Sequence, residues 1–529
     1  MKVASEAPAR AASPGDGDAT TTTRSARPWV IAAVVAVLVA GVAFRFVALS
    51  EMWLDEALTV NISRLPLRDI PDWLRHDGAP PLYYFMLHVW TGVFGSSNFA
   101  VRSLSGILSV AALVPMWFAG RRIAGRSGAW IAVLVMASSP FAIQFGSEAR
   151  MYSLVMLLVL LGYLAVRRLL ERPSLGRQTV VALITGLLLY TQYWSLYLVA
   201  VVGALMVWQA WRGRDPDQRH AAWSGIVAIV AGVITFLPWL PTFLYQSKHT
   251  GTPWGDPIFV TASFAFAVRD FAGGEHSEAY ALLVVLLAVT VVAVFGITID
   301  RYRIELDVRT RPGVRAETAV WVFTLLLGGA VAFVTSGTFA GRYASVLYPL
   351  FVLVVVYGIT VFADTRARAI LLAVIVLIGL GSGARNTFDD RTQAAQVADV
   401  IRARAKPGDV VLYCPDQLGP SVSRILEGKR GLDQLTFPVG DDPDLVDWVD
   451  YKERRADVNP NAFARQVVDR VEPGGKIWYV IAVQYRGGNE GQCDAVQRAL
   501  TPLRGNPTLR VEPDDNFPEF LGLLEYPGQ

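Results

Sequence analysis

Apolar stretches long enough to cross a lipid bilayer recur along residues 29–384. A spanning helix needs about 20 mostly apolar residues, and a backbone inside lipid must satisfy its own hydrogen bonds, so each stretch is expected to be helical. The expected spans are 29–48, 99–120, 127–146, 151–168, 178–191, 195–211, 221–241, 279–299, 317–336, 344–362 and 367–384. The sequence therefore predicts a polytopic α-helical membrane protein with about eleven transmembrane helices.

Composition supports a membrane domain joined to a soluble one. Charged residues make up 18% of the chain and hydrophobic residues 53%, whereas soluble domains carry about 25% charge. This excludes an ordinary soluble enzyme, and a net charge of +3 does not indicate a nucleic-acid partner. Residues 385–529 carry a net charge of −5 and lack any apolar run of spanning length, while the remainder carries +8. We expect a transmembrane domain at 29–384 and a soluble domain at 385–529.

The two ends of the chain differ from the apolar middle. Residues 1–28 are small, polar and charged without apolar periodicity, so we expect a disordered N-terminus. The first apolar stretch is long and no clear cleavage site follows it, which favours an uncleaved anchor over a signal peptide. The C-terminal domain has an α/β pattern, with a helix at 393–402 and strands at 410–413 and 477–483. Its cysteines, Cys414 and Cys493, are the only two in the chain; they either pair in an oxidising compartment or stay as buried thiols.

Loop charge predicts the orientation in the membrane. With a cytoplasmic N-terminus, the five inside loops hold 17 Lys and Arg residues and the five outside loops hold 8, as the positive-inside rule requires. Eleven crossings of the cell membrane then place the C-terminal domain outside the cytoplasm. The apolar segment 80–95 must not span, because a crossing there would reverse every later loop. It is short and begins with two prolines, so we expect an interfacial helix within a long outer loop, 49–98.

Charged and aromatic residues gather at the predicted outer ends of the helices, where charge is costly and tends to be functional. They are Asp55, Glu56, Asp77, Tyr83, Tyr84, Glu148, Arg150, Tyr152, Arg342 and Tyr343. Each has a simpler explanation when taken alone. The acidic pair could cap a helix, the arginines could snorkel, as we expect for Arg45, and the aromatics could form an interfacial belt. Their joint occurrence on one side of the membrane indicates a site with a base and an anion clamp.

Four motifs carry a family resemblance. The Asp55-Glu56 pair, the PPLYY segment at 80–84, the EARMY segment at 148–152 and the RY pair at 342–343 resemble the polyprenyl-phosphate-sugar-dependent membrane glycosyltransferases of the GT-C type. This family 39-like group includes protein O-mannosyltransferases and lipid A aminoarabinose transferases. The resemblance covers about 29–384 and implies interfacial helices in the first outer loop and an active site at the outer face. Many relatives have His before the two prolines where this chain has Ala79, which leaves the roles of His76 and Asp77 open.

The resemblance implies a role for four of the candidate residues. Asp55 matches the general base, Glu56 a neighbour that holds the acceptor or a metal, and Arg150 and Arg342 the groups that face the donor phosphate. The substrate-contacting candidates are Asp77, Tyr83, Tyr84, Glu148, Tyr152 and Tyr343. The chemistry agrees, because an acceptor hydroxyl needs a carboxylate to take its proton and a phosphate leaving group needs fixed cations, which the planar fork of arginine supplies.

The expected activity is transfer of a sugar, with mannose as the first candidate, from a polyprenyl-phosphate donor to a glycan, glycolipid or protein acceptor outside the cytoplasm. A single displacement would invert the anomeric centre. Membrane lipids and the lipid-linked donor are the expected partners, and the sequence establishes no cofactor. A divalent metal held by His249, Asp256 or His276 is an alternative that no ligand spacing supports.

A lipid-linked sugar transporter or flippase is the main alternative function, although such proteins often carry internal repeats and midplane charges. A non-catalytic scaffold or carbohydrate-binding protein is a third.

Overall fold

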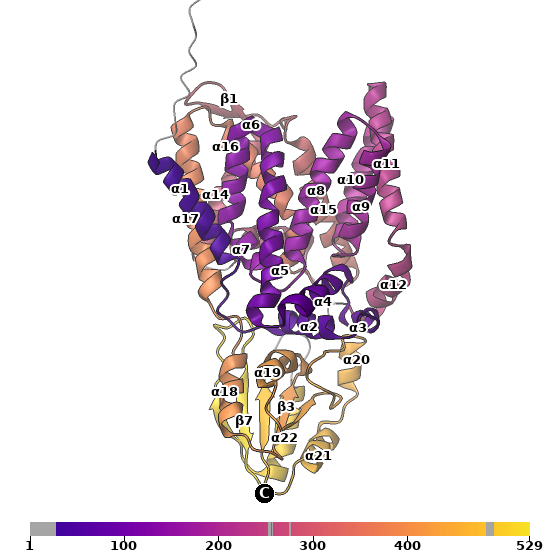
Figure 1. The fold of residues 1–529 in the computed structure, drawn as a ribbon, viewed down its shortest axis with the longest axis vertical. Helices are drawn as coiled ribbons and strands as arrows, with labels where there is room; N and C mark the ends of the chain where they lie inside the picture. Colours follow the sequence, from indigo (N-terminus) through magenta and orange to yellow (C-terminus); the bar gives the residue numbers. More distant parts are fainter. Residues whose placement is uncertain (1–27, 252–254, 256–257, 275–276, 483–490) are drawn as a thin grey trace, which may run out of the picture.

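A helical bundle and a smaller α/β domain make up the protein, and the α/β domain lies against one end of the bundle (Figure 1). The computed structural model describes residues 28–251, 255, 258–274, 277–482 and 491–529. The N-terminal segment that the sequence predicts to be disordered therefore lies, except for its last residue, outside the described residues. The expected fold class, a polytopic helical protein with a C-terminal sheet domain, is confirmed.

The bundle consists of long apolar helices. They are α1 (Pro28–Phe44), α5 (Asn98–Ala111), α6 (Leu113–Ser138), α7 (Pro140–Gly146), α8 (Tyr152–Glu171), α9 (Leu175–Leu189), α10 (Ser195–Arg212), α11 (Pro216–Ile234), α14 (Ser277–Phe295), α15 (Arg315–Val334), α16 (Tyr348–Val361) and α17 (Thr365–Phe388). Every predicted span overlaps at least one of these helices. Among the described residues, seven helical stretches are long and apolar enough to cross a membrane, so the number of crossings stays a prediction.

Two local features modify the predicted spans. Helix α6 loses helical geometry at Ala124 and Gly125, where Gly125 adopts a φ of 60°, a region that glycine enters without a Cβ clash. The chain turns there, so α6 contributes to two neighbouring predicted spans. The predicted span 279–299 ends early, because residues Gly296–Thr298 form strand β1, which pairs with β2 (Ile304–Leu306) in a short hairpin.

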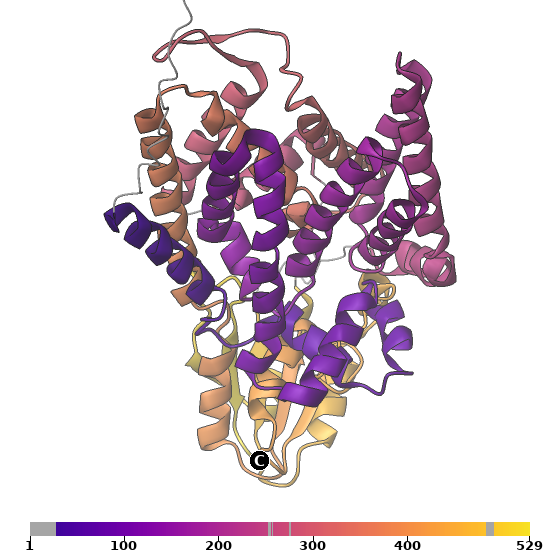
Figure 2. The same ribbon diagram turned by 45° about the horizontal axis from the view of Figure 1, so that its top comes forward.

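Three short helices form a layer between the bundle and the C-terminal domain: α2 (Leu54–Arg64), α3 (Ile70–Asp77) and α4 (Leu82–Phe94) (Figures 1 and 2). The segment predicted not to span is α4, which has only 13 residues and follows Pro81. The β1–β2 hairpin and the turn of α6 lie at the opposite end of the bundle (Figure 1). Loops rich in arginine and the C-terminal domain are thus at opposite ends, the arrangement that the loop charges require.

Helix α1 packs tightly on α6. A Cβ atom at Gly41 would overlap the carbonyl oxygen of Ala137. Arg45, one turn further on, is fully buried and donates hydrogen bonds from Nη2 to the carbonyl of Met136 at 2.7 Å and from Nη1 to that of Ala137 at 2.9 Å. The expectation that Arg45 snorkels is therefore wrong. Its guanidinium is buried and donates hydrogen bonds to carbonyl oxygens in the last turn of α6.

The C-terminal domain is built on a five-stranded sheet in the order β4-β3-β5-β7-β6. Strand β3 (Val410–Cys414) is parallel to β4 (Asp433–Thr436) and β5 (Ile477–Ile481), whereas β7 (Gly522–Tyr526) is antiparallel to β5 and β6 (Thr508–Val511). Strands β3 and β5 are buried along their whole length, which explains their almost continuous apolar sequences.

Helices cover both faces of this sheet. On one face α18 (Ala394–Arg404) and α19 (Gly419–Leu426) pack over Val411 and Trp478. On the other face α21 (Pro460–Asp469) and α22 (Gln492–Arg504) pack over Val410 and Tyr479. The predicted helix at 393–402 and the two predicted strands coincide with α18, β3 and β5.

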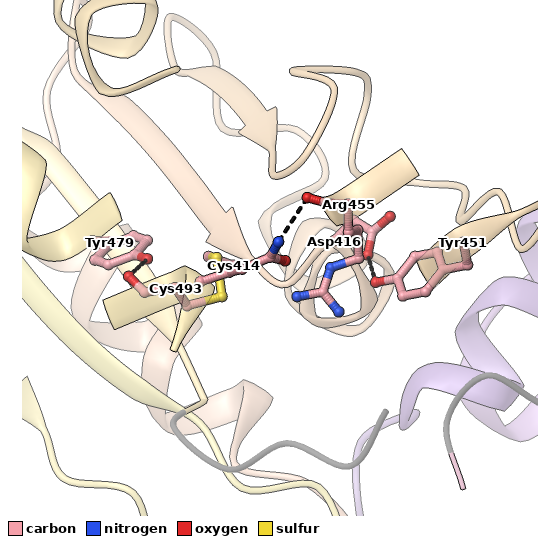
Figure 3. Close-up of a disulfide and its surroundings, with 7 residues drawn as sticks. Cys414, Asp416, Tyr451, Arg455, Tyr479 and Cys493 are labelled. Carbon is pink, nitrogen blue, oxygen red and sulfur yellow. Dashed lines mark hydrogen bonds between the residues drawn. A yellow bond between two sulfur atoms is a disulfide. The ribbon is translucent and has the colours of Figure 1, made fainter. Parts of the chain in front are cut away.

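A disulfide joins the two cysteines of the chain. Cys414, the last residue of β3, is bonded to Cys493 in α22, and Tyr479 donates a hydrogen bond to the carbonyl oxygen of Cys493 at 2.8 Å (Figure 3). Beside the disulfide, Tyr451 of α20 (Tyr451–Ala456) donates a hydrogen bond to Asp416. Of the two alternatives left open by the sequence, the structure has the disulfide, which fits an oxidising compartment.

Candidate active site

The acidic pair lies in the first turn of α2. Trp53 is extended, the helix begins at Leu54, and Asp55 and Glu56 follow directly. Carboxylates are favoured there, because the first turn of a helix carries partial positive charge. The two neighbours have different surroundings: 16% of the Asp55 side chain is exposed, whereas the Glu56 side chain is completely buried. They are thus suited to different tasks.

The Glu56 carboxylate is fully engaged by the protein. Arg102 of α5 donates to both of its oxygens, from Nε at 2.8 Å and from Nη2 at 2.6 Å, and the Ala149 amide donates at 2.8 Å. Burial works to raise the pKa of Glu56, but the ion pair with Arg102 outweighs it and holds the pKa below its usual value. Glu56 therefore stays ionised and ties α2 to α5 and to the segment that carries Arg150.

The Asp55 carboxylate faces the two arginines that the motifs singled out. Arg342 Nη1 lies 3.3 Å from Asp55 Oδ2. Arg150 Nη1 donates to Thr59 Oγ1 at 2.6 Å and to the backbone carbonyl of Asp55 at 3.3 Å. Three segments far apart in the sequence thus meet around one carboxylate. Among the described residues, Asp55 Oδ2 is buried and accepts no hydrogen bond, and its nearest charged neighbour is Arg342.

The tyrosines of α4 support this centre from one side. Tyr84 donates from its hydroxyl to Asp77 Oδ2 at 2.6 Å. Burial raises the pKa of Asp77, although Arg150 and the Tyr84 bond oppose the shift. The Tyr83 hydroxyl pairs with Ser105 Oγ at 2.8 Å, and Ser105 Oγ lies 3.1 Å from the carbonyl oxygen of Arg150, to which it donates. Asp77 and both tyrosines thus belong to the same cluster as Asp55.

The remaining predicted residues are Glu148, Tyr152 and Tyr343. Glu148 is buried, and burial raises its pKa to about 7, while Arg391 opposes the shift and the Glu56 carboxylate adds to it. The hydroxyl of the buried Tyr152 makes no hydrogen bond among the described residues. The Arg342 guanidinium lies 5.9 Å from the ring centre of Tyr343, whose ring stacks on Trp194. All ten residues chosen from the sequence therefore lie on the segments that surround Asp55.

Several of the buried polar atoms that make no hydrogen bond lie in this cluster. Within the described part of the chain they include Trp53 Nε1, Asp55 Oδ2, Glu148 Oε1, Arg150 Nε, Tyr152 OH, Arg391 Nη1 and Glu519 Oε2. Folded proteins satisfy most buried polar groups, so each exception needs a reason. A concentration of exceptions around one carboxylate and two arginines indicates a site arranged for a polar, anionic ligand.

Three residues of the cluster were missed by the sequence analysis. Arg102 holds Glu56, Arg391 Nη2 donates to Ser147 Oγ at 2.9 Å, and Glu519 Oε1 accepts the Leu54 amide at 3.0 Å. Arg102 stands at the start of an apolar stretch, a position that could have identified it, because charge near the membrane is costly. No pattern in residues 385–529 identifies Arg391 or Glu519.

The described residues supply no ligand set for a metal. Among residues 28–251, 255, 258–274, 277–482 and 491–529, no three or more His, Cys, Asp or Glu side chains are arranged so that they could hold a metal ion. His249 pairs with Asp450 at 3.0 Å, and the two other candidates, Asp256 and His276, lie outside the described residues.

Comparisons with known proteins concern the family and the fold. A family model described as dolichyl-phosphate-mannose-protein mannosyltransferase matches residues 78–239, a region that contains Tyr83, Tyr84, Glu148, Arg150 and Tyr152. No curated protein matched the sequence.

Solved structures match over most of the chain. ArnT from Cupriavidus metallidurans in the apo state has a TM-score of 0.57 and 12% identity, over 94% of this chain and 97% of that one. The same protein bound to undecaprenyl phosphate has a TM-score of 0.51 and 15% identity, over 95% and 98%. The Archaeoglobus fulgidus oligosaccharyltransferase has a TM-score of 0.50 and 12% identity, over 84% and 67%. At such identities the likeness is one of fold. With the family model, it confirms the resemblance: the chain has the fold of the GT-C type glycosyltransferases and is similar to the O-mannosyltransferases and aminoarabinose transferases.

Proposed function

We propose that the protein transfers a sugar from a polyprenyl-phosphate donor to a glycan, glycolipid or protein acceptor at the outer face of the cell membrane. The family model named for dolichyl-phosphate-mannose supports a lipid-linked donor and makes mannose the first candidate sugar. The ArnT structure with undecaprenyl phosphate supports the same class of donor. In this proposal the N-terminus is cytoplasmic and the C-terminal domain extracytoplasmic, as the loop charges predict.

The observation that carries the proposal is the position of Asp55 between Arg150 and Arg342. A partly exposed carboxylate can take a proton from a hydroxyl, and two arginines from other segments can bind a phosphate beside it. The residues of the cluster come from the layer of α2, α3 and α4 and from the segments of the bundle that meet it, and this layer lies at one end of the bundle (Figure 1). A donor that keeps its polyprenyl tail in the bilayer can present its phosphate only at such an interface.

The chemistry follows from these positions. Asp55 removes the proton of the acceptor hydroxyl, the acceptor oxygen attacks the anomeric carbon, and the bond from that carbon to the phosphate oxygen breaks. Arg150 and Arg342 stabilise the lipid phosphate that leaves. The attack and the departure occur on opposite faces of the carbon, so the anomeric configuration inverts. We assign Glu56 a positioning role, because both of its oxygens are already paired with Arg102.

Replacing the base tests the proposal. We expect Asp55→Asn to lower transfer by about 10²–10⁴-fold, the usual loss when a general base is removed, while the variant still binds the donor. The assay uses purified protein, radiolabelled polyprenyl-phosphate sugars and membrane extract, so that the labelled product identifies both donor and acceptor. Glu51→Gln is the matched control, since the Glu51 carboxylate accepts a hydrogen bond from Asn98 at 2.6 Å in the same outer loop.

Two outcomes would contradict the proposal. Full transfer by Asp55→Asn would remove Asp55 from the role of base. Net movement of a lipid-linked sugar across vesicles by the wild-type protein, without transfer to any acceptor, would favour the transporter or flippase.

A further inference from the structure

A carboxylate of the C-terminal domain caps the helix that carries Asp55. Glu519 Oε1 accepts the Leu54 amide at 3.0 Å, across 465 residues of sequence. The first amides of a helix have no partner within the helix, and Trp53 at the N-cap position makes no side-chain cap. Glu519 is only 1% exposed, so water cannot readily take over this role. The start of α2 is therefore held by another domain.

Glu519 is itself held firmly. Its amide donates to the carbonyl of Arg391 at 3.0 Å, and its own carbonyl accepts the Gln393 amide at 3.0 Å. Residue Thr392 forms a parallel bridge with Glu519. The backbone of Glu519 is thus paired with residues 391–393, and its side chain projects from this pairing.

Arg391 lies between α17 and α18 and contacts both the segment that carries Glu56 and the segment that carries Glu148. Its amide donates to Ser50 Oγ at 2.8 Å and its Nη2 donates to Ser147 Oγ at 2.9 Å. Its Nη1 lies 3.8 Å from Glu56 Oε2 and 3.9 Å from Glu148 Oε2. One connection of the C-terminal domain therefore reaches both membrane-domain segments that carry the acidic residues of the site.

A second docking point lies near Asp77. The Trp448 amide donates to the carbonyl of His76 at 3.0 Å, and Asp447 Oδ1 lies 2.9 Å from His76 Nδ1. The Asp450 amide donates to the carbonyl of His249 at 2.8 Å. The C-terminal domain thus forms hydrogen bonds with the first outer loop at two places, one next to Asp55 and one next to Asp77.

We infer that the docked C-terminal domain completes the active site, with Glu519 as a positioning residue that fixes the direction of Asp55 through the Leu54 amide. This inference deepens the proposed function and rests on it wherever activity is measured. The physical reason is proximity: Asp55 directly follows Leu54, and a displacement of about 1 Å in a reacting group can cost about 10²-fold in rate.

The test compares three substitutions in the full-length protein. Glu519→Ala removes the acceptor, Glu519→Asp shortens it, and Glu519→Gln keeps a carbonyl oxygen in reach. Glu525→Gln is the matched control, because Glu525 is also a buried acid of this domain but pairs with Lys476 and Arg510. Each variant is examined by amide hydrogen exchange of the α2 segment and by kcat and KM for transfer.

We expect Glu519→Ala and Glu519→Asp to speed exchange in the first turn of α2 at least tenfold and to lower kcat about 10–100-fold. Glu519→Gln and Glu525→Gln should stay within about threefold of wild type on both measures. If Glu519→Ala does not fold, the contrast between Glu519→Asp and Glu519→Gln carries the test.

The two readouts separate this inference from the proposed function. Unchanged exchange in α2 on loss of the acceptor would overturn the positioning role, and so would a Glu519→Gln variant that behaves like Glu519→Ala. Absence of transfer in the wild-type protein, with faster α2 exchange in Glu519→Ala, would refute the glycosyl transfer and leave the positioning role standing.

Discussion

Two neighbouring acidic residues have different surroundings at this site. Asp55 keeps one oxygen free of hydrogen bonds, whereas Glu56 is buried and paired with Arg102. Breaking a buried ion pair leaves an uncompensated charge and costs about 3–5 kcal/mol, so loss of Glu56 should damage the fold as well as the activity. A variant of Glu56 alone is therefore a poor test of catalysis, and Asp55 is the informative position.

Glu148 gives the site a titration near neutral pH. Burial raises the pKa of its carboxyl to about 7, against an ordinary value near 4.5, so Glu148 is neutral below that pH and negative above it. A phosphodiester donor keeps its negative charge throughout this range. Donor binding should therefore weaken as the pH rises through about 7.

We expect the wild-type KM for the donor to increase between about pH 6 and pH 8, and Glu148→Gln to abolish this increase, since the glutamine stays neutral. Measuring kcat and KM over this range with both proteins checks the expectation. An identical rise in KM for the variant would assign the titration to another group.

At the scale of elements, close packing of α1 on α6 brings the start of the first outer loop to the site. The backbone of α1 approaches α6 so closely at Gly41 that a side chain there would overlap the Ala137 carbonyl. Arg45 then bonds the carbonyls at the end of α6. Helices in membranes often associate through such small residues.

We expect Gly41→Val to destabilise the protein by about 1–3 kcal/mol, the usual cost of forcing extra volume into a packed contact. Thermal unfolding in detergent measures the loss. Gly203→Val in α10 is the control, because a Cβ atom there meets nothing within 4 Å. Equal melting temperatures for the two variants would contradict the close α1–α6 contact.

At the scale of the whole molecule, the C-terminal domain has hydrophobic cores of its own and also contributes residues to the candidate site. Its sheet has its own apolar clusters on both faces, yet Arg391 and Glu519 reach into the acidic cluster. The stability of this domain should therefore influence the activity of the membrane domain.

The disulfide offers a way to test the stability of this domain. Cys414 and Cys493 are 79 residues apart, and the chain-entropy relation assigns such a cross-link about 4.5 kcal/mol. We expect reduction to lower the melting temperature of the wild-type protein, and a Cys414→Ser, Cys493→Ser double variant to be insensitive to the reductant. Thiol labelling of the native protein before reduction would contradict the bond.

Much of the fold was predictable because its signals are local. The length of each apolar stretch specified a helix, and the two prolines together with the loop charges predict that α4 does not span. The short hairpin at Gly296–Thr298 was missed, because its apolar residues continue the preceding helix pattern without a break. The candidate residues were recognised from short motifs that lie on four separate segments.

The sequence by itself determined which segments are apolar helices, which loops carry positive charge and which few polar residues stand at the helix ends. Only the tertiary structure decided that Arg102 neutralises Glu56, that Arg45 is buried, and that Arg391 and Glu519 belong to the site. The reason is that hydrophobic periodicity acts over a few residues, whereas these contacts join distant parts of the chain, in one case across 465 residues. Such pairs depend on how the two domains pack, and no local pattern records that packing.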